Sequence, residues 1–483
     1  MGKKSVKVNY IYNVSYQILL IVIPLITIPY ISRVLGAEGL GIYSYVESIV
    51  TYFVLFATMG ITYYGQREVA FLQDDRKKRT ELFWETKFFT IIISAITLVV
   101  YVIFCLFQRN SLLYLVLAIN IMNVAMDVTW LFQGMEEFKT ITTVNVFFKV
   151  LTVVYIFLFV RDSGDVVVYA LGVSLLTLLG NAFLWTKIGR YVDKPYFKGI
   201  HPFRNYKTII SLFIPTIAIQ VYTVLDKTML GVITSDAAQN GYYDQALKLS
   251  KTTLTLVTAL GAVMVPRIGY HYSRHEDEKV RSFMYRGYNF VWFLGMPLCF
   301  GLMGVADNLV PWFYGPGYDE VTVLLKVLSF LILAIGINNV TGIQYLIPTE
   351  RQNIFTFTVV LGAIINFVLN MVLIPIMQAK GAAVASVVAE TVIALVQLLI
   401  VRKEISMAKV LICSWKYLVS SLAMYGVLCL EQRYFMASII NTIIMTLSGI
   451  GVYVVTLWIF RDEMLISNGK IIVDKLRRKH QDE

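Results

Sequence analysis

Charged side chains inside an apolar stretch are the first candidates for chemistry in this sequence. Asp244, Lys248 and Lys251 are spaced i, i+4, i+7, which places all three on one face of a helix. An ionised group in hydrocarbon costs at least about 2.5–3.5 kcal/mol, so such groups usually face a protein interior or a water-filled cavity. Lys251 lies roughly 13 Å along a helix that begins near residue 242. We therefore take Lys251 first, and Lys248 second, as candidate functional cations on this helix.

A second group of charged residues lies close to two glycine-rich turns. Its members are Arg33, Glu47, Asp226 and Lys227. Lys227 and Arg33 join the candidate functional cations, whereas the three carboxylates of Asp226, Asp244 and Glu47 are candidates for a coupling ion. Three alternatives stay open: an ion pair of Lys248 with Asp244, an ion pair of Lys227 with Asp226, and simple anchoring of Arg33 at a membrane interface.

Other ionisable residues lie singly in apolar stretches. They are Asp127, Lys149, Lys326 and Glu390. A carboxylate among them could carry a coupling proton, and a structural hydrogen bond is the alternative for each. The four cysteines show no C-x-x-C spacing and the four histidines show no ligand spacing, so we expect no metal site and no disulfide framework.

The composition indicates an all-α polytopic membrane protein. Of 483 residues, 57% are hydrophobic and 15% are charged, and the mean hydropathy is +0.68. A helix needs about 20 apolar residues to cross the hydrocarbon core of a bilayer. The first apolar run is longer than a signal-peptide core and has no small-residue cleavage site, so we expect it to be retained. We expect fourteen spans, at approximately 10–31, 42–64, 84–107, 112–132, 141–160, 166–186, 208–230, 242–265, 287–304, 322–346, 354–375, 381–401, 410–430 and 437–459.

The positions of the 42 lysines and arginines predict the orientation. With both termini in the cytoplasm, 30 of them lie in inner segments, five in outer turns and seven within spans. Because cytoplasmic loops carry an excess of Lys and Arg, this split favours that orientation. The net charge of +11 then mainly reflects this orientation. The basic residues of the C-terminal tail face anionic lipid of the inner leaflet. Nucleic acid is therefore not an expected partner.

The sequence also indicates an internal duplication. The glycine-rich turn from Ser32 to Tyr45 has a looser copy from Leu230 to Asp244, and the end of the fourth span resembles the end of the tenth. These pairs predict two six-helix lobes related by an axis along the membrane normal, an arrangement found in transporters with a site between the halves. We expect a lobe over 1–187, a linker over 188–207, a second lobe over 208–403, two more spans over 404–460 and a tail over 461–483.

Glycine and proline at these turns predict hinges between the lobes. Glycine permits unusual backbone angles, and proline inside a helix removes a hydrogen bond and kinks it. The candidate hinge residues are Pro24, Gly36, Gly41, Pro215 and Gly241. The alternatives are that the glycines form tight static turns and that the prolines only shape helix packing.

Two motifs resemble those of a known family. Ile28-Pro29-Tyr30-Ile31-Ser32-Arg33-Val34-Leu35-Gly36-Ala37-Glu38-Gly39-Leu40-Gly41-Ile42-Tyr43 follows the first span, and Trp130-Leu131-Phe132-Gln133-Gly134-Met135-Glu136 follows the fourth. With the two six-span halves, they resemble the repeat-unit flippases for O-antigen and capsular polysaccharide. Those flippases belong to the multidrug/oligosaccharidyl-lipid/polysaccharide exporter superfamily, with multidrug and toxin extrusion proteins and lipid II flippases. The two extra spans depart from the twelve-span members.

The resemblance implies that a polyprenyl-diphosphate-linked oligosaccharide moves from the inner to the outer leaflet of a bacterial cytoplasmic membrane by alternating access. It implies no enzyme activity and no cofactor beyond coupling to a proton or sodium gradient. Membrane lipids, a polysaccharide polymerase and other export proteins are the candidate partners. In lipid II flippases spans one, two, seven and eight line a cationic cavity, and the matching basic residues here are Arg33, Lys227, Lys248 and Lys251.

Two other functions compete with this one. A multidrug extruder of the same superfamily would take cationic drugs and favour an acidic or neutral cavity, so lysine in the eighth span argues against it. A membrane glycosyltransferase or polymerase would need an outer catalytic segment, and the longest outer turn, from about Val305 to Val321, has few residues in which to build one.

Overall fold

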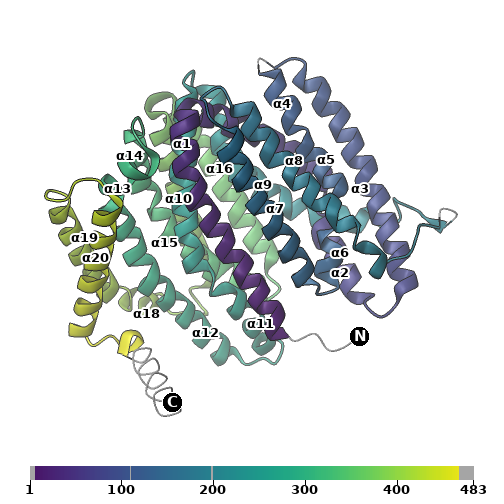
Figure 1. Ribbon diagram of the computed structural model, residues 1–483. Helices are drawn as coiled ribbons and strands as arrows, with labels where there is room; N and C mark the ends of the chain where they lie inside the picture. The colour runs from purple at the N-terminus through teal and green to yellow at the C-terminus, as the bar shows by residue number, and fades with distance from the viewer. Residues whose placement is uncertain (1–5, 109, 197–198, 467–483) are drawn as a thin grey trace, which may run out of the picture. The chain divides into compact units, whose positions relative to one another are not determined.

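The computed structural model describes residues 6–108, 110–196 and 199–466, without the side chains of residues 6–18, 20–21, 214–216, 218–219 and 262. Over these residues the chain is helical and contains no strand, which confirms the all-α prediction (Figure 1). Eleven helical segments of this part are long and apolar enough to cross a membrane, or up to twelve if the bent pair Ala237–Thr258 and Val263–Tyr272 forms one span. The protein is therefore a multi-pass membrane protein, while the count of fourteen and the pseudo-symmetry remain predictions.

The chain divides into two compact units, Met1–Gly241 and Tyr242–Glu483. The lobe boundaries predicted above remain a prediction. Unit 1 contains α1 (Val6–Thr58), α2 (Ile61–Phe71), α3 (Arg76–Cys105), α4 (Ser111–Leu117), α5 (Ile119–Met126), α6 (Thr129–Gly134), α7 (Phe138–Phe159), α8 (Val166–Trp185), the short 3₁₀ turn Ile188–Arg190 and α9 (Tyr206–Ile233). Helix α10 (Ala237–Thr258) begins at the end of unit 1 and continues as the first helix of unit 2.

Unit 2 continues with a longer series of helices. They are α11 (Gly261–Tyr272), α12 (Asp277–Phe290), the π-helix Val291–Gly295, α13 (Met296–Tyr314), α14 (Asp319–Leu328), α15 (Phe330–Asn338), the π-helix Asn339–Leu346, α16 (Gln352–Met377), α17 (Ala379–Val401), α18 (Met407–Ile412), α19 (Trp415–Glu431) and α20 (Ile439–Ile459). Helices α13, α19 and α20 pack on one another, as do α16 and α17.

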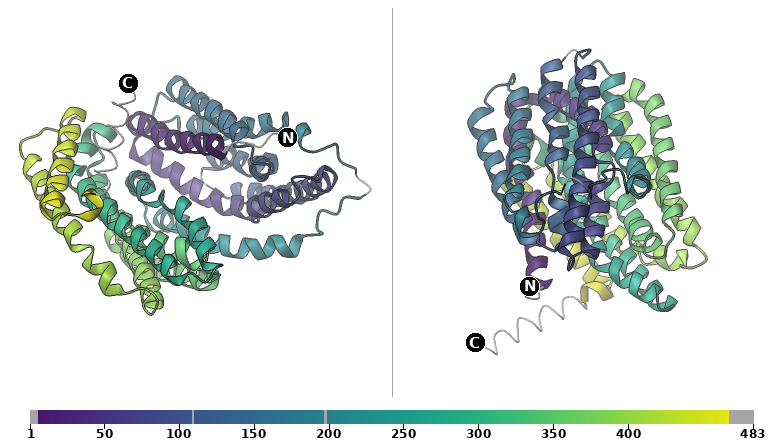
Figure 2. Two further views of the ribbon diagram at one scale, coloured as in Figure 1. Left: turned by 90° about the horizontal axis from the view of Figure 1, so that it is seen from below. Right: turned by 90° about the vertical axis from the view of Figure 1, so that its right-hand side faces the viewer.

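Aromatic and aliphatic side chains form the core of unit 1. Tyr43 packs edge-on against Tyr169, with ring centroids 5.0 Å apart. The hydroxyl of the buried Tyr101 donates to the carbonyl oxygen of Tyr114 at 2.8 Å, so its polar end is satisfied inside the core. Figure 2 shows the purple and blue helices of this unit running alongside one another, in line with the packing of α1 on α3, α5 and α7.

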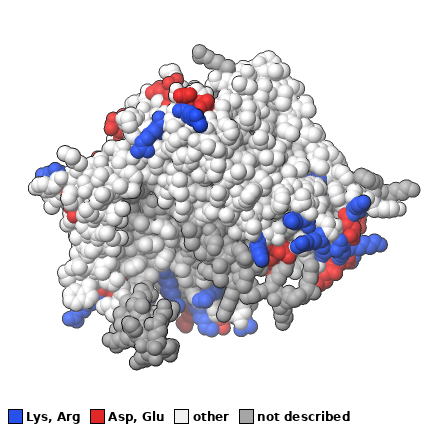
Figure 3. Space-filling view, viewed as in Figure 1, with Lys and Arg blue, Asp and Glu red and all other residues white. Residues whose placement is uncertain are grey.

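Large apolar side chains also cover the outside of the helices. Val99, Phe147 and Leu447 are each more than half exposed, as expected for residues that face lipid rather than water. On the face drawn in Figure 3, uncharged residues cover the sides of the helices, and charged residues gather near helix ends.

The predicted turn after the first span is a local break in a long helix. Gly36 has φ 68° and ψ 174°, whereas the residues on either side continue α1. This backbone region is essentially restricted to glycine. Pro24 and Pro29 both lie inside the helix before the break.

The predicted fourth span is made of three short helices, α4, α5 and α6. Asp127 follows α5 with extended backbone angles, and its carboxylate oxygen Oδ1 accepts a hydrogen bond from the Thr129 amide at 2.8 Å. The side chain therefore satisfies a backbone donor at the start of α6.

The segment between α8 and α9 is tied to the start of α3. Arg76 forms an ion pair with Asp193 at 2.8 Å, and the indole Nε1 of Trp84 donates to the Asp193 carbonyl oxygen at 2.8 Å. Arg79 is buried and donates from Nε and Nη2 to the carbonyl oxygen of Tyr191 at 3.0 and 2.8 Å. The segment that follows α8 is thereby held against α3.

Candidate functional site

The charged face of α10 contains an ion pair and an exposed lysine. The Lys248 Nζ lies 2.6 Å from the Asp244 Oδ2, and the Asp244 side chain is 1% exposed while that of Lys248 is 38% exposed. The ion-pair alternative for Lys248 is therefore present in the structure. Lys251, three residues further along the helix, is exposed. The same side of α10 thus contains the ammonium groups of two lysines and one buried carboxylate.

The other predicted cations lie in unit 1. Arg33 is exposed, and its Nη1 donates to the carbonyl oxygen of Pro29 at 2.5 Å, within its own helix. Lys227 is half-buried on α9 and Asp226 beside it is buried. The Lys227 carbonyl oxygen accepts a hydrogen bond from Asn240 Nδ2 at 2.8 Å, which fastens the end of α9 to the start of α10.

The two glycine-rich turns meet at a close crossing of α1 and α10. A Cβ atom at Gly41 would lie 1.8 Å from the carbonyl oxygen of Ala237, and a Cβ atom at Gly241 would lie 2.0 Å from the carbonyl oxygen of Ala37. The small residues follow an A-x-x-x-G spacing on both helices, which lets two backbones approach closely. Gly41 and Gly241 therefore allow the two helices to pack closely. The side chain of Pro215, another predicted hinge residue, lies outside the described residues.

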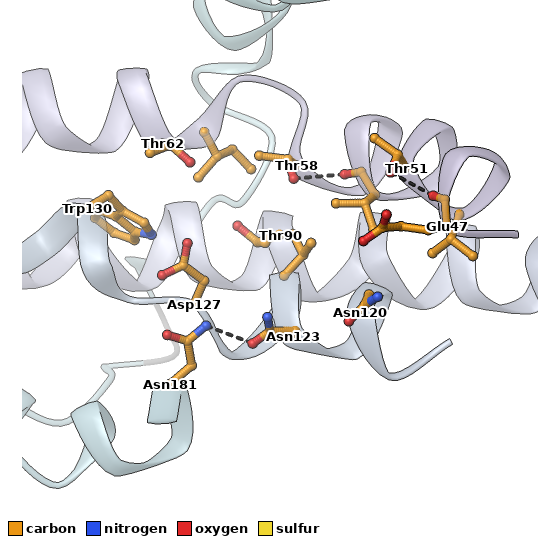
Figure 4. Close-up of a pocket in the computed structure, with 14 residues that line it drawn as sticks. Glu47, Thr51, Thr58, Thr62, Thr90, Asn120, Asn123, Asp127, Trp130 and Asn181 are labelled. Atoms are coloured by element: carbon orange, nitrogen blue, oxygen red, sulfur yellow. Dashed lines mark hydrogen bonds between the residues drawn. The ribbon is translucent and has the colours of Figure 1, made fainter. Parts of the chain in front are cut away.

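Unit 1 contains a half-open polar cavity of about 350 Å³. Its polar lining comes from α1, α2, α3, α5, α6 and α8 and from the segment after α5. It includes the carboxylates of Glu47 and Asp127, both named in the sequence analysis. Figure 4 shows Asp127 and Thr62 toward one end and Glu47 and Asn120 toward the other. The polar side chains that line it are Glu47, Thr51, Thr58, Thr62, Thr90, Asn120, Asn123, Asp127, Trp130 and Asn181.

Sequence reasoning named two of these residues but missed the cavity. The signal was the spacing of Asn120, Asn123 and Asp127 at i, i+3 and i+7, which places three polar side chains on one helical side of an apolar stretch. The facing side chains come from segments distant in sequence, so their spacing alone does not bring them together.

Unit 2 contains a half-open apolar cavity of about 460 Å³. Pro297, Leu298 and Gly301 of α13 face Met424 and Leu428 of α19 across it. Further lining residues are Thr253, Phe293, Leu294, Leu302, Val305, Thr446, Gly449, Ile450, Tyr453, Val454 and Leu465. The hydroxyl of Tyr453 donates to the carbonyl oxygen of Phe293 at 2.7 Å, so even this polar group is satisfied by the protein. The cavity suits a hydrocarbon chain.

Comparisons with solved structures agree with this architecture. The structure described as "Lipid II flippase MurJ, inward closed conformation" superposes with a TM-score of 0.71 at 15% identity, covering 95% of this chain and 99% of that chain. An inward-facing multidrug resistance MATE family transporter of the MOP superfamily gives a TM-score of 0.59 at 13% identity, covering 80% of this chain and 99% of that chain. These likenesses show the fold.

Comparisons with sequences are more specific. The chain is 23% identical over 418 residues to the "Putative O-antigen transporter" of Escherichia coli (strain K12), covering 85% of this chain and 99% of that protein. It is 22% identical over 277 residues to the "Probable low-salt glycan biosynthesis flippase Agl15" of Haloferax volcanii, covering 56% of this chain and 57% of that protein. The family model described as "Polysaccharide biosynthesis protein" matches residues 6–270. The chain therefore belongs to the polysaccharide biosynthesis protein family.

Proposed function

We propose that this protein is a flippase that moves a polyprenyl-diphosphate-linked oligosaccharide from the inner to the outer leaflet of the bacterial cytoplasmic membrane. Both termini lie in the cytoplasm, and the two halves alternate access to the substrate. The family and the names of its relatives support the substrate class. A polysaccharide polymerase and other export proteins are the partners that would use the product.

The main structural support for the proposal is the set of side chains that α10 contributes to unit 2. Lys248 and Lys251 present ammonium groups on this helix, and Thr253 of the same helix lines the apolar cavity. Residues i and i+2 of a helix do not share a face, so Lys251 and Thr253 lie on opposite sides of α10. One helix thus contributes a cationic face on one side and part of an apolar cavity on the other, and these two chemistries correspond to the diphosphate and to the hydrocarbon chain of the lipid.

The chemistry of the diphosphate favours lysine on this face. A phosphate that leaves water needs paired charge to offset its desolvation, and ammonium groups supply charge-assisted hydrogen bonds. Lys248 pairs with Asp244 at 2.6 Å, and Lys251 is exposed one turn further along the same helical face. Lys251, which lies further from the start of the helix, is the principal proposed phosphate ligand, with Lys248 as a second one. Lys227 and Arg33 extend the proposed set on unit 1.

The test measures the leaflet distribution of undecaprenyl-diphosphate-linked glycan in cells with and without the protein. The proposal requires that the glycan accumulates on the inner leaflet in the deletion strain and that wild-type protein restores the outer-leaflet pool. A normal distribution in the deletion strain would reject the proposal. Restoration of cationic-drug resistance without any change in glycan distribution would instead support a multidrug extruder.

A further inference from the structure

The half-open polar cavity of unit 1 has the chemistry of a sugar site. We propose that it binds one uncharged sugar ring of the transported glycan. The inference rests on the proposed function for the source of the sugar, and every residue that lines the cavity belongs to unit 1. Its volume of about 350 Å³ lies at the lower end of the range of ligand pockets, roughly 300–1,000 Å³, which suits a ligand as small as one ring.

A buried donor points into this cavity. Trp130 is 2% exposed, and its indole N–H makes no hydrogen bond to the described residues. Figure 4 shows the indole nitrogen on the side of the ring that faces Asp127 and Thr90. The ring is held in place, because a Cβ atom at Gly65 would lie 2.5 Å from it and the Phe83 ring centroid lies 5.4 Å away. A buried tryptophan N–H usually has a partner, so this donor indicates a ligand with an acceptor oxygen.

The neutral lining groups offer both donors and acceptors. Asn181 donates to the Asn123 Oδ1 at 2.7 Å, which leaves the Asn123 Nδ2 available to a ligand. The Asn120 amide lines the cavity without a hydrogen bond to another described residue. The hydroxyls of Thr58 and Thr90 each donate to a carbonyl oxygen of their own helix at 2.8 Å, so their lone pairs can accept. A sugar hydroxyl both donates and accepts, and this mixture of groups is complementary to it.

The two carboxylates lie at opposite ends of the cavity (Figure 4). Glu47 accepts a hydrogen bond from the Tyr43 hydroxyl at 3.2 Å, and Asp127 accepts one from the Thr129 amide at 2.8 Å. A carboxylate has about four acceptor sites, so each of the two can also accept a sugar hydroxyl. Apolar side chains complete the lining and suit the C–H groups of a sugar ring. They are Val50, Val54, Ile61 and Val124.

The charge of the lining disfavours an acidic sugar. The described lining contains the carboxylates of Glu47 and Asp127 and no lysine or arginine. Outside the lining, the fully buried Lys87 donates from Nζ to the backbone carbonyl oxygen of Asp127 at 2.8 Å. Two carboxylates and one ammonium leave a net charge of minus one, which repels a uronic acid in a low-dielectric region. An uncharged hexose or N-acetylhexosamine meets no such repulsion.

The experiment follows the indole N–H resonance of Trp130 by NMR on the purified full chain in detergent, with isotope-labelled tryptophan and assignment through Trp130→Phe. The probes are methyl β-glucoside, methyl N-acetyl-β-glucosaminide and methyl β-glucuronide. A ligand of about 15 heavy atoms binds with a Kd on the order of 1 mM at ordinary ligand efficiency, so titration to about 20 mM is decisive. At least one uncharged probe should shift the resonance saturably, and the glucuronide should bind at least tenfold more weakly.

Two variants separate hydrogen bonding from charge. Asn120→Leu should weaken binding of the uncharged probe at least fivefold, because it removes a lining amide. Asn145→Leu is the matched control, because it makes the same change in unit 1 outside the lining and should bind as wild type does. Glu47→Gln should narrow the difference between the glucuronide and the uncharged probe, since it removes one repelling charge. Unchanged selectivity in Glu47→Gln would overturn the assignment to an uncharged sugar.

A cavity that holds water only would give no saturable shift with either uncharged probe, and this result would overturn the proposal. Wild-type affinity in Asn120→Leu would do the same. Sugar binding combined with normal outer-leaflet delivery by Asn120→Leu would show that the bound ring is not part of the transported glycan. The titration requires no transport, so its result is independent of the leaflet measurement that tests the flippase proposal.

Discussion

Gly41 and Ala237 approach so closely that a Cβ atom at Gly41 would lie 1.8 Å from the Ala237 carbonyl oxygen. The obstacle is backbone and not the end of a flexible side chain, so the crossing of α1 and α10 cannot yield without moving a helix. Gly241 makes the reciprocal approach to Ala37. The first turn of α10 is therefore fixed to unit 1 before the helix continues into unit 2.

Gly41→Ala should destabilise the protein because the added methyl group forces the two helices apart. Overpacking a well-packed site typically costs about 1–3 kcal/mol, and we expect the upper part of that range. Thermal unfolding in detergent measures the change. Gly189→Ala is the control, because a Cβ atom there would meet nothing within 4 Å. Equal midpoints for the two variants would contradict the close crossing.

Gly36→Ala isolates backbone strain from steric contact. Gly36 has φ 68° and ψ 174°, and an added Cβ atom would meet nothing within 4 Å. A non-glycine residue in such a region costs on the order of 1–3 kcal/mol. We expect a lower unfolding midpoint in Gly36→Ala, and a further loss when Gly36→Ala is combined with Gly41→Ala. Wild-type stability of the single variant would show that α1 can straighten at this point.

Lys251→Ala should reduce delivery of the lipid-linked glycan to the outer leaflet at unchanged expression. Lys251→Arg should keep part of the activity, because charge is retained while the geometry of the donor changes. Asp244→Ala should matter less for transport. Outer-leaflet labelling of the glycan at matched protein levels measures all three variants. Wild-type transport by Lys251→Ala would remove Lys251 as a necessary phosphate ligand.

The contact of Arg76 with Asp193 should make the segment after α8 sensitive to acid. Hydrogen bonds from the Arg76 guanidinium hold the pKa of the Asp193 carboxyl below its ordinary value of 3.8. A carboxylate with a lowered folded-state pKa contributes stability above its unfolded-state pKa, and that stability is lost as the pH falls through the lowered pKa. The attachment should therefore hold at pH 7 and weaken below about pH 4.

A nitroxide label at Lys194→Cys, in a background with Cys413→Ser, reports this attachment. Its mobility should rise below about pH 4, near the ordinary carboxyl pKa. Asp193→Asn should show the higher mobility already at pH 7, because it removes the charge that Arg76 binds. Exposed ion pairs contribute little to global stability, so the unfolding midpoint should hardly change. Equal mobility of both proteins at every pH would show that the ion pair does not hold the segment.

The helical, membrane-spanning character of the chain and several of its local contacts follow from the amino-acid sequence alone. Long apolar runs must form helices in lipid because the backbone groups have no water to bond. The i, i+4 spacing of Asp244 and Lys248 brings the two charges within reach on one helix, and the structure forms that ion pair at 2.6 Å. The glycine at position 36 marked a backbone break that only this residue type readily permits.

The pairing of helix faces depends on the folded arrangement of the whole chain. The approach of Gly41 to Ala237 joins residues almost two hundred positions apart, and helical periodicity fixes the face of a residue but not its neighbour. The polar cavity arises in the same way, because Glu47, Thr90, Asp127 and Asn181 come from distant segments. Packing of the apolar faces around them brought these oxygens together, and no spacing within one segment encodes that arrangement.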